Sequence, residues 1–112
     1  MSKDDFHVIA YRILQYLYEC MKAGQDPDAN KITAANYEIN DRYFNVIIKE
    51  LYNNGYIDNV YEVNTIGSLY TRYTIKSDIT ITLKGIEYLT DNTFIEKAKR
   101  FFKATKEIVQ FI

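Results

Sequence analysis

The sequence predicts a small, mainly helical α+β protein, and three observations support this prediction. The chain has 112 residues, 47% of them hydrophobic and 26% charged, which is the balance of one globular domain with a single core. Three segments repeat apolar residues at helical spacing, one near the start, one in the middle and one at the end. Between the second and the third, β-branched and aromatic residues gather in short runs that are typical of strands.

The first helix is predicted from Asp4 to about Ala23. One side of this segment is apolar at spacings of three and four, with Phe6, Ile9, Ala10, Ile13, Leu17, Cys20 and Met21. The other side is polar and holds Arg12, Gln15, Glu19 and Lys22. Ser2, three residues before Asp5, resembles the start of a capping box, and Gly24 follows the last periodic residue as a left-handed C-cap would.

The next segment predicts a turn and a short helix. Residues 25–31 hold the only proline together with Asp and Asn, a composition that is typical of turns. Thr33 is expected to cap a short helix over Ala34 to Tyr37. No glycine separates it from the following helix, so Glu38 or a neighbour must adopt the conformation of the turn.

A second long helix is predicted from Asp41 to Asn53, capped by Asn40 and ended by Gly55. Its buried stripe is spaced i, i+3, i+4, i+7 and consists of Phe44, Ile47, Ile48 and Leu51. At about 100° per residue, the opposite face consists of Arg42, Val46, Lys49 and Asn53. That face is the part of the helix that a partner could reach.

Residues 56–63 and 70–75 predict the two strands of a hairpin. Tyr61, Tyr70 and Tyr73 fall on these strands. Aromatic side chains at such positions either stack on single-stranded bases or form cross-strand pairs that stabilise a thin sheet. No basic groove accompanies them, which favours cross-strand pairs.

After a break at residues 76–78, a third strand and a short helix are predicted. Ile79, Ile81 and Leu83 alternate with threonines, the period of a strand with one buried face. Thr82 is expected to cap a helix from Leu83 to about Leu89.

The last segment, residues 93–112, predicts an amphipathic helix that opens with a second capping box, Thr93 to Glu96. Its apolar stripe is too wide to face water, so it is expected to pack on the first helix, on a second copy of the chain, or on both. The residues expected to mediate a homodimer are Phe94, Ala98, Phe101, Phe102, Thr105, Ile108, Val109 and Ile112.

This order of elements predicts a winged helix-turn-helix domain (residues 1–92) with an added C-terminal helix (93–112), together one domain. Two helices joined by a turn and followed by a two-stranded ribbon are the parts of that fold. Four strings carry a resemblance that extends over nearly the whole chain: YRIL at 11–14, YECMK at 18–22, LYNNGYI at 51–57 and ITITLKGIEYL at 79–89. They resemble the YjcQ-like family of small winged-helix proteins from Gram-positive bacteria and their prophages, which implies a regulator of prophage origin.

The sequence contains few residues or motifs that are typical of an enzyme. His7 is the single histidine and is expected to be a solvated residue at the start of a helix, while Cys20 lies on an apolar stripe as a small buried side chain. One cysteine and one histidine cannot form the usual zinc site, and no phosphate-binding glycine motif is present. Asp26 and Asp28 are better explained as solvated turn residues than as cation ligands. No catalytic residue, metal, cofactor or small-molecule ligand is therefore expected.

The face of the second long helix is the candidate site for double-stranded DNA, because this helix enters the major groove in winged-helix proteins. Arginine and asparagine can address guanine and adenine, valine can contact a thymine methyl group, and lysine can meet phosphate. Cations of the ribbon and of the following helix could add backbone contacts. The candidates are Arg42, Tyr43, Asn45, Val46, Lys49, Asn53, Arg72, Lys76 and Lys84. The alternative is that these are ordinary solvated positions.

Charge limits the strength of any such binding. Between residues 31 and 84 there are six basic and six acidic residues, so electrostatic attraction to DNA alone is weak. Residues 1–93 carry 9 basic and 13 acidic residues, whereas 94–112 carry 5 and 2. The basic side of the last helix is either a solvated face or a surface for an acidic partner or DNA.

The sequence thus leads to a sequence-specific DNA-binding regulator, with a protein-interaction module as the alternative. The opening residues, MSKDD, lack the apolar run of a signal peptide, and no apolar run approaches the ~18 residues of a membrane span, so a cytoplasmic protein is expected.

Overall fold

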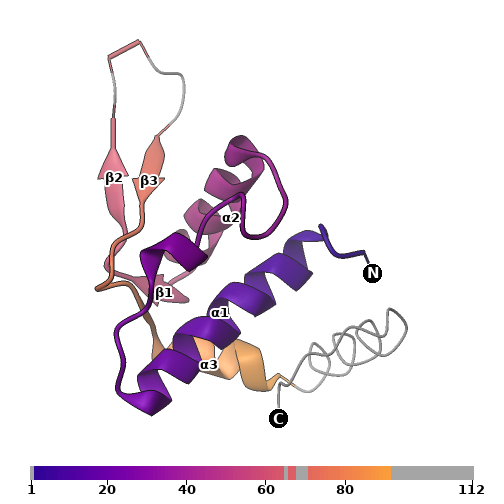
Figure 1. Cartoon of the computed structure of the whole chain (residues 1–112), viewed down its shortest axis with the longest axis vertical. Helices are drawn as coiled ribbons and strands as arrows, with labels where there is room; N and C mark the ends of the chain where they lie inside the picture. The colour runs from indigo at the N-terminus through magenta and orange to yellow at the C-terminus, as the bar shows by residue number, and fades with distance from the viewer. Residues whose placement is uncertain (1, 65, 68–70, 92–112) are drawn as a thin grey trace.

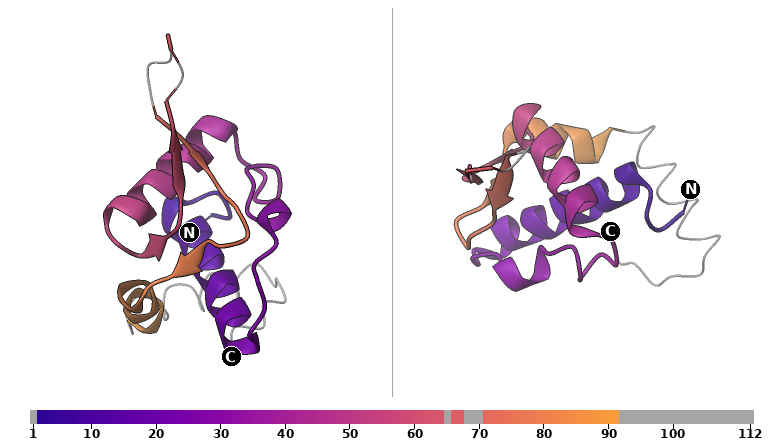
Figure 2. Two further views of the ribbon diagram at one scale, coloured as in Figure 1. Left: turned by 90° about the vertical axis from the view of Figure 1, so that its left-hand side faces the viewer. Right: turned by 90° about the horizontal axis from the view of Figure 1, so that it is seen from above.

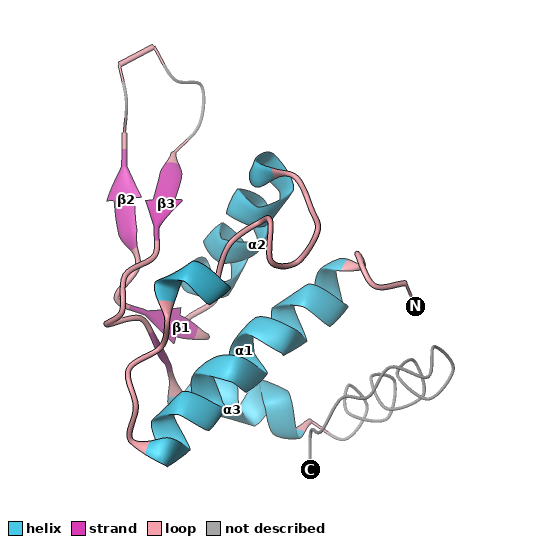
Figure 3. Cartoon of the chain, viewed as in Figure 1, coloured by secondary structure: helices cyan, strands magenta, loops and turns pink. Residues whose placement is uncertain are grey.

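The protein is a mainly helical α+β structure with small antiparallel strand pairs (Figure 1). The computed structural model describes residues 2–64, 66–67 and 71–91. Within these ranges the helices are α1 (Phe6–Ala23), the 3-10 helix η1 (Ala29–Lys31), α2 (Asp41–Asn53) and α3 (Leu83–Thr90). The strands are β1 (Ile57–Asp58), β2 (Tyr61–Val63), β3 (Arg72–Thr74) and β4 (Thr80–Ile81) (Figure 3).

The hydrophobic core surrounds α1, because this helix is apolar on more than one side. It contacts α2, α3 and β4, and its buried residues form one cluster with side chains from α2, β1, β4 and α3. The fully buried large side chains are Ile9, Ile13, Leu14, Leu17, Ile32, Ile47, Ile48, Ile57 and Ile79. Among the described residues, no buried side-chain nitrogen or oxygen lacks a hydrogen-bond partner. The predicted apolar stripes of the first two long helices therefore form one core.

Most predicted helix ends are confirmed. Asn40 Oδ1 accepts a hydrogen bond from the Tyr43 backbone N–H (2.8 Å), and Thr82 Oγ1 accepts one from the Gly85 N–H (3.1 Å). Gly24 adopts the left-handed conformation (φ 68°), as a C-cap glycine does.

The capping box predicted at Ser2 forms only in part: Asp5 Oδ2 accepts a hydrogen bond from the Ser2 backbone N–H (3.1 Å), but the Asp5 N–H donates to the Ser2 carbonyl oxygen (3.1 Å) and not to the hydroxyl. The N-cap of α1 is Asp5, and the Ser2 hydroxyl binds the carboxylates of Asp4 (2.6 Å) and Asp5 (2.9 Å). Ser2 lies too far before the first helical residue, Phe6, for its hydroxyl to serve the helix N–H groups.

The short helix predicted over Ala34 to Tyr37 is wrong. Thr33 Oγ1 does accept from the Asn36 N–H (3.1 Å), but the segment forms turns, and the short helical element, η1, lies earlier in the chain. Glu38 has a φ of 59° and makes the turn before α2, as expected in the absence of a glycine.

The strand predicted over residues 56–63 is divided in two. Asn59 has a positive φ of 61° and bends the chain between β1 and β2. On one side of the bend, Ile57 pairs with Ile81 of β4, and on the other, Glu62 pairs with Tyr73 of β3. A single hydrophobic run thus contributes to two separate strand pairs, one in the core and one that projects from the body as a ribbon (Figure 2).

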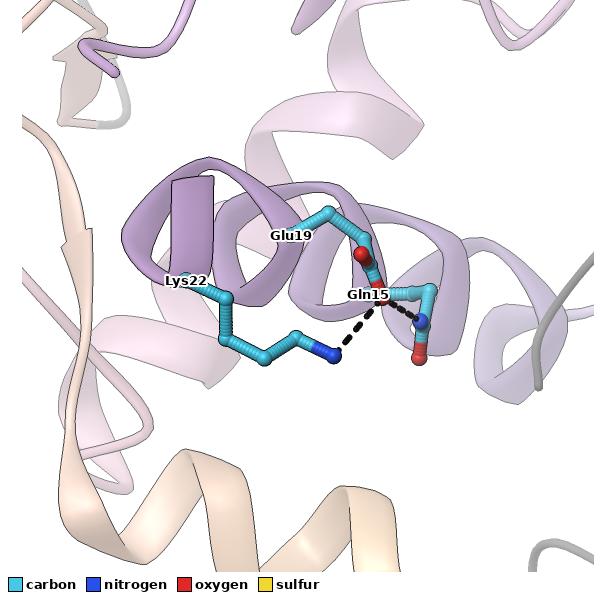
Figure 4. Close-up of polar contacts among 3 residues, drawn as sticks. All are labelled: Gln15, Glu19 and Lys22. Atoms are coloured by element: carbon cyan, nitrogen blue, oxygen red, sulfur yellow. Dashed lines mark hydrogen bonds and ion pairs between the residues drawn. The ribbon is translucent and has the colours of Figure 1, made fainter. Parts of the chain in front are cut away.

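On the predicted polar side of α1, Glu19 and Lys22 are exposed, whereas Arg12 and Gln15 are half-buried. Gln15, Glu19 and Lys22 interact with one another (Figure 4). Glu19 Oε1 accepts a hydrogen bond from Gln15 Nε2 (2.7 Å) and lies 3.1 Å from Lys22 Nζ.

Two residues that the apolar pattern predicted to be buried, Met21 and Leu83, are exposed. Leu83 is the first residue of α3, because Thr82 ends the alternating strand and begins the helix.

The predicted dimer residues in 93–112 lie outside the described part of the chain. In the described ranges, no helix combines the length and the apolar character that crossing a membrane requires.

Candidate functional site

The face of α2 that points away from the core is exposed, as the periodicity predicted. Arg42, Val46, Lys49 and Asn53 all lie on it, and Val46 is 44% exposed. At about 100° per residue, Arg42 and Lys49 lie on the side of this face toward Asn45, whereas Glu50 lies on the other side. The two cations therefore lie on the edge of the face nearer to Asn45.

Asn45 itself joins α2 to the ribbon. Its Nδ2 donates a hydrogen bond to the Thr71 carbonyl (2.8 Å), and its Oδ1 accepts one from the Tyr73 backbone N–H (3.0 Å). Both ends of the amide are used and the side chain is half-buried, so the structure gives Asn45 an internal contact in place of the predicted contact with adenine.

Tyr43 has a comparable internal contact. Its hydroxyl donates a hydrogen bond to the Asp4 carbonyl (2.6 Å), which ties α2 to the residues just before α1. Burial raises the pKa of Tyr43, and the nearby Asp4 and Asp5 carboxylates raise it further. The predicted flanking role of Tyr43 in DNA contact is thus replaced by an anchoring role between the two helices.

A hollow of about 210 Å³ lies between the start of α2 and β3, lined by Asp41, Phe44, Asn45, Arg72 and Tyr73. Arg72 is therefore brought to the N-terminal end of α2, near the turn that carries Arg42. Asp41 lies at the same place, so an acidic side chain accompanies these cations. Asp41 thus offsets only part of the positive charge of Arg42 and Arg72 at the centre of the candidate surface.

The two faces of the ribbon differ. Tyr61 lies opposite Thr74 and Val63 opposite Arg72, and these four residues are exposed. On the other face, the Tyr73 ring lies 6.2 Å from the Tyr52 ring of α2. Tyr61 and Tyr73 are paired across the ribbon with Thr74 and Glu62 and not with each other, since the alternation of a strand sends them to opposite faces. Tyr70 lies outside the described residues.

The base of the ribbon is closed by contacts that the sequence did not reveal. The Tyr61 hydroxyl donates a hydrogen bond to the Asp78 carboxylate, and Asn59 Nδ2 donates to the Asp78 carbonyl (2.9 Å). Lys76 Nζ lies 4.6 Å from the centre of the Tyr61 ring. The hydrogen bond to Asp78 raises the pKa of Tyr61. These contacts join residues 15 positions or more apart, so no local pattern could have indicated them.

Lys84 lies at the other end of α2 from Arg42 and Arg72. Its ammonium nitrogen is 5.7 Å from the centre of the Tyr56 ring, beside Gly55, where α2 has ended. The helix of 13 residues is about 20 Å long, so a partner must extend along α2 to meet all three cations. The structure therefore places Arg42 and Arg72 near the start of α2 and Lys84 near its end.

The two residues considered for catalysis, Cys20 and His7, lie on α1. Cys20 is buried, as predicted. His7 is exposed at the start of α1, and its Nδ1 lies 3.1 Å from the Tyr88 hydroxyl. In the described part of the chain, no three His, Cys, Asp or Glu side chains gather in a way that could hold a metal ion.

These observations define a small, mainly helical α+β protein in which an exposed helix face lies beside a two-stranded ribbon. The family model of the YjcQ protein family matches this chain over residues 11–108, and the chain belongs to that family. This confirms the resemblance noted in the sequence. The comparison with curated proteins and the comparison with solved structures each gave no match.

Proposed function

We propose that this protein is a winged-helix DNA-binding protein that regulates transcription. In this proposal α2 is the recognition helix, which enters the major groove, and the β2–β3 ribbon is the wing, which contacts the adjacent backbone. The observation that supports it is the pairing of an exposed helix face, with Arg42, Val46 and Lys49, and a projecting ribbon hydrogen-bonded to that same helix.

The assignment of contacts follows the exposure of each side chain. Arg42 is the candidate for a bidentate contact with guanine, and Val46 for a thymine methyl group. Lys49 and Arg72 are suited to phosphate, and Asn53 lies further along the same face. Lys76 and Lys84 lie outside this face and are candidates for contacts with the DNA backbone. The proposed role is binding and not catalysis.

The affinity of this surface is expected to be moderate. With equal numbers of acidic and basic residues between 31 and 84, about three to four phosphates can be neutralised per protomer. A homodimer would double that number and would require a two-fold symmetric site. We therefore propose a dimer on a palindromic sequence, which sedimentation at several concentrations tests: a monomer at high concentration contradicts it.

The experiment is a selection from random duplexes at low salt, followed by fluorescence anisotropy on the enriched sequence. The double variant Arg42→Ala/Lys49→Ala should lose binding and lower the salt slope by about two. The control Lys22→Ala/Lys31→Ala removes the same charge from α1 and η1 and should bind normally. No enriched sequence, or unchanged binding by the first variant, overturns the proposal.

A protein-interaction module is the second candidate. It is favoured by the equal numbers of acidic and basic residues between 31 and 84 and by the exposed Tyr61 and Val63, which share one face of the ribbon. If the selection enriches no sequence while Tyr61→Ala/Val63→Ala abolishes capture of a defined protein partner, this second function replaces the first.

A further inference from the structure

The Asn45 amide pairs with β3 as the backbone of a neighbouring strand would. Residues 71 and 73 are two apart, so the Thr71 carbonyl and the Tyr73 N–H point to the same edge of the strand. Asn45 donates to the first (2.8 Å) and accepts from the second (3.0 Å), which is the pattern that a backbone amide offers in a sheet. One side chain of α2 thus covers the edge of β3 that β2 does not pair.

The ribbon depends on such contacts for its orientation. β2 and β3 have three residues each, and neither has a buried side chain. A two-stranded hairpin of this size is marginally stable alone. Its described attachments are the Asn45 hydrogen bonds and the Tyr52–Tyr73 ring contact to α2, and the contacts of Asp78 at its base.

Arg72 lies between the two residues that Asn45 holds. Its backbone is therefore fixed relative to α2 on both sides, at Thr71 and at Tyr73. On the helix, Arg42 lies three residues before Asn45, one turn away. Asn45 thus fixes the position of Arg72 on the ribbon relative to Arg42 on α2.

We infer that Asn45 is a positioning residue, which locks the ribbon to the recognition helix so that Arg42 and Arg72 meet one DNA duplex in fixed register. This inference rests on the proposed function. It assigns Asn45 no contact with the DNA. Without Asn45, the helix still binds its groove, but the ribbon no longer delivers Arg72 to the backbone.

The first test measures the contact itself, in the full chain without DNA. Asn45→Ala should raise the hydrogen-exchange rate of the Tyr73 amide about tenfold, and Asn45→Asp, which keeps the acceptor for that amide, by less. Asn30→Ala, a change on η1 away from the ribbon, is the control and should leave the rate unchanged. An unchanged Tyr73 rate in Asn45→Ala, with α1 amides still protected, overturns the inference.

The second test measures coupling in duplex binding. In the wild type, Arg72→Ala should weaken binding and lower the salt slope by about one. In the Asn45→Ala background, Arg72→Ala should have no further effect, whereas Arg42→Ala should keep its full effect. A purely structural role for Asn45 would change the effects of both arginines equally and would overturn the inference. If Asn45→Ala does not fold, Asn45→Asp is used in the same cycle and should reduce the effect of Arg72→Ala in part.

The two hypotheses fail in different ways. If the wild type binds no duplex, the proposed function is overturned and so is this role in it, whatever the exchange rates show. If the wild type binds and the arginines are not coupled through Asn45, only the positioning role is overturned.

Discussion

The two strand pairs of this protein are similar in length and opposite in character. β1 and β4 lie in the core, where Ile57 and Ile81 are buried opposite each other. β2 and β3 project from the body, and none of their side chains is buried. The first pair is stabilised by the removal of apolar surface from water, the second by polar side-chain contacts at its edge and its base.

This difference separates the part of the molecule that maintains the fold from the part that is available to a partner. Substitutions in the core pair should be costly for stability, whereas those in the ribbon should act mainly on binding. Each of the following predictions tests or sharpens that comparison.

The largest effect is expected from truncation of a core strand residue. Ile57→Ala should lower the free energy of unfolding by about 3 kcal/mol, because it leaves a cavity where a side chain only 1% exposed had been. Val63→Ala, in the ribbon and 42% exposed, should cost less than about 1 kcal/mol. Urea unfolding of both variants measures the difference, and equal losses would contradict the division between the two pairs.

A smaller loss is expected at Gly85, where α3 meets Tyr56, the residue just before β1. A Cβ atom there would lie 2.3 Å from the Tyr56 carbonyl oxygen and 2.7 Å from Ile81 Cγ1. Backbone cannot move aside cheaply, so Gly85→Ala should cost about 2 kcal/mol even though alanine favours helices. The control is Gly67→Ala in the ribbon loop, where a Cβ atom would meet open space but the backbone has a positive φ. Comparing the thermal unfolding of the two variants separates overpacking from backbone strain. A Gly85→Ala variant as stable as the wild type would exclude the close contact.

Alkaline pH should distinguish a core tyrosine from a ribbon tyrosine. Burial raises the pKa of Tyr37 to about 12 from the ordinary 10.0, although the Arg12 guanidinium above its ring opposes the shift. The pKa of Tyr37 is thus higher in the folded than in the unfolded chain. The contribution of the neutral side chain to the free energy of unfolding is therefore full below pH 10 and is lost as pH rises through 12. The loss is about 2 kcal/mol.

The measurement is the free energy of unfolding between pH 9 and pH 12. Tyr37→Phe should flatten its decline in part, since burial also raises the pKa of Tyr88 to about 12. Tyr61→Phe should change the decline less, because Tyr61 is exposed and its raised pKa comes mainly from one hydrogen bond to Asp78. Equal effects of the two variants would show that burial is not the main cause.

The smallest effect is expected on the polar side of α1. Glu19→Ala removes the hydrogen bond from Gln15 and the ion pair with Lys22, all in solvent, and should cost less than about 0.5 kcal/mol. A loss comparable with that of Ile57→Ala would mean that surface contacts, and not the core, stabilise α1. Chemical unfolding at low and at 1 M salt tests this, since salt should remove most of the ion-pair contribution.

The helices could be predicted because their signals are local. The bounds of α2 follow from its apolar spacing and from the Asn40 cap, whose hydrogen bond spans only three residues. The same holds for Thr82 at the start of α3 and for Gly24 at the end of α1. The exposed positions of Arg42, Val46, Lys49 and Asn53 follow from the same period, and the structure agrees with all four.

The role of Asn45 and the division of the 56–63 run were decided only by tertiary structure. Asn45 has the sequence position of a surface residue, but residues 26 and 28 positions away take both of its polar atoms. The bend at Asn59 arises because its two flanks pair with different strands, 24 and 11 positions apart at Ile57–Ile81 and Glu62–Tyr73. The sequence by itself therefore determined where α2 and α3 begin and the main buried face of each long helix, since those depend on neighbours within one turn. Which side chains remain available to a partner depended on contacts between distant segments, and these exist only in the folded chain.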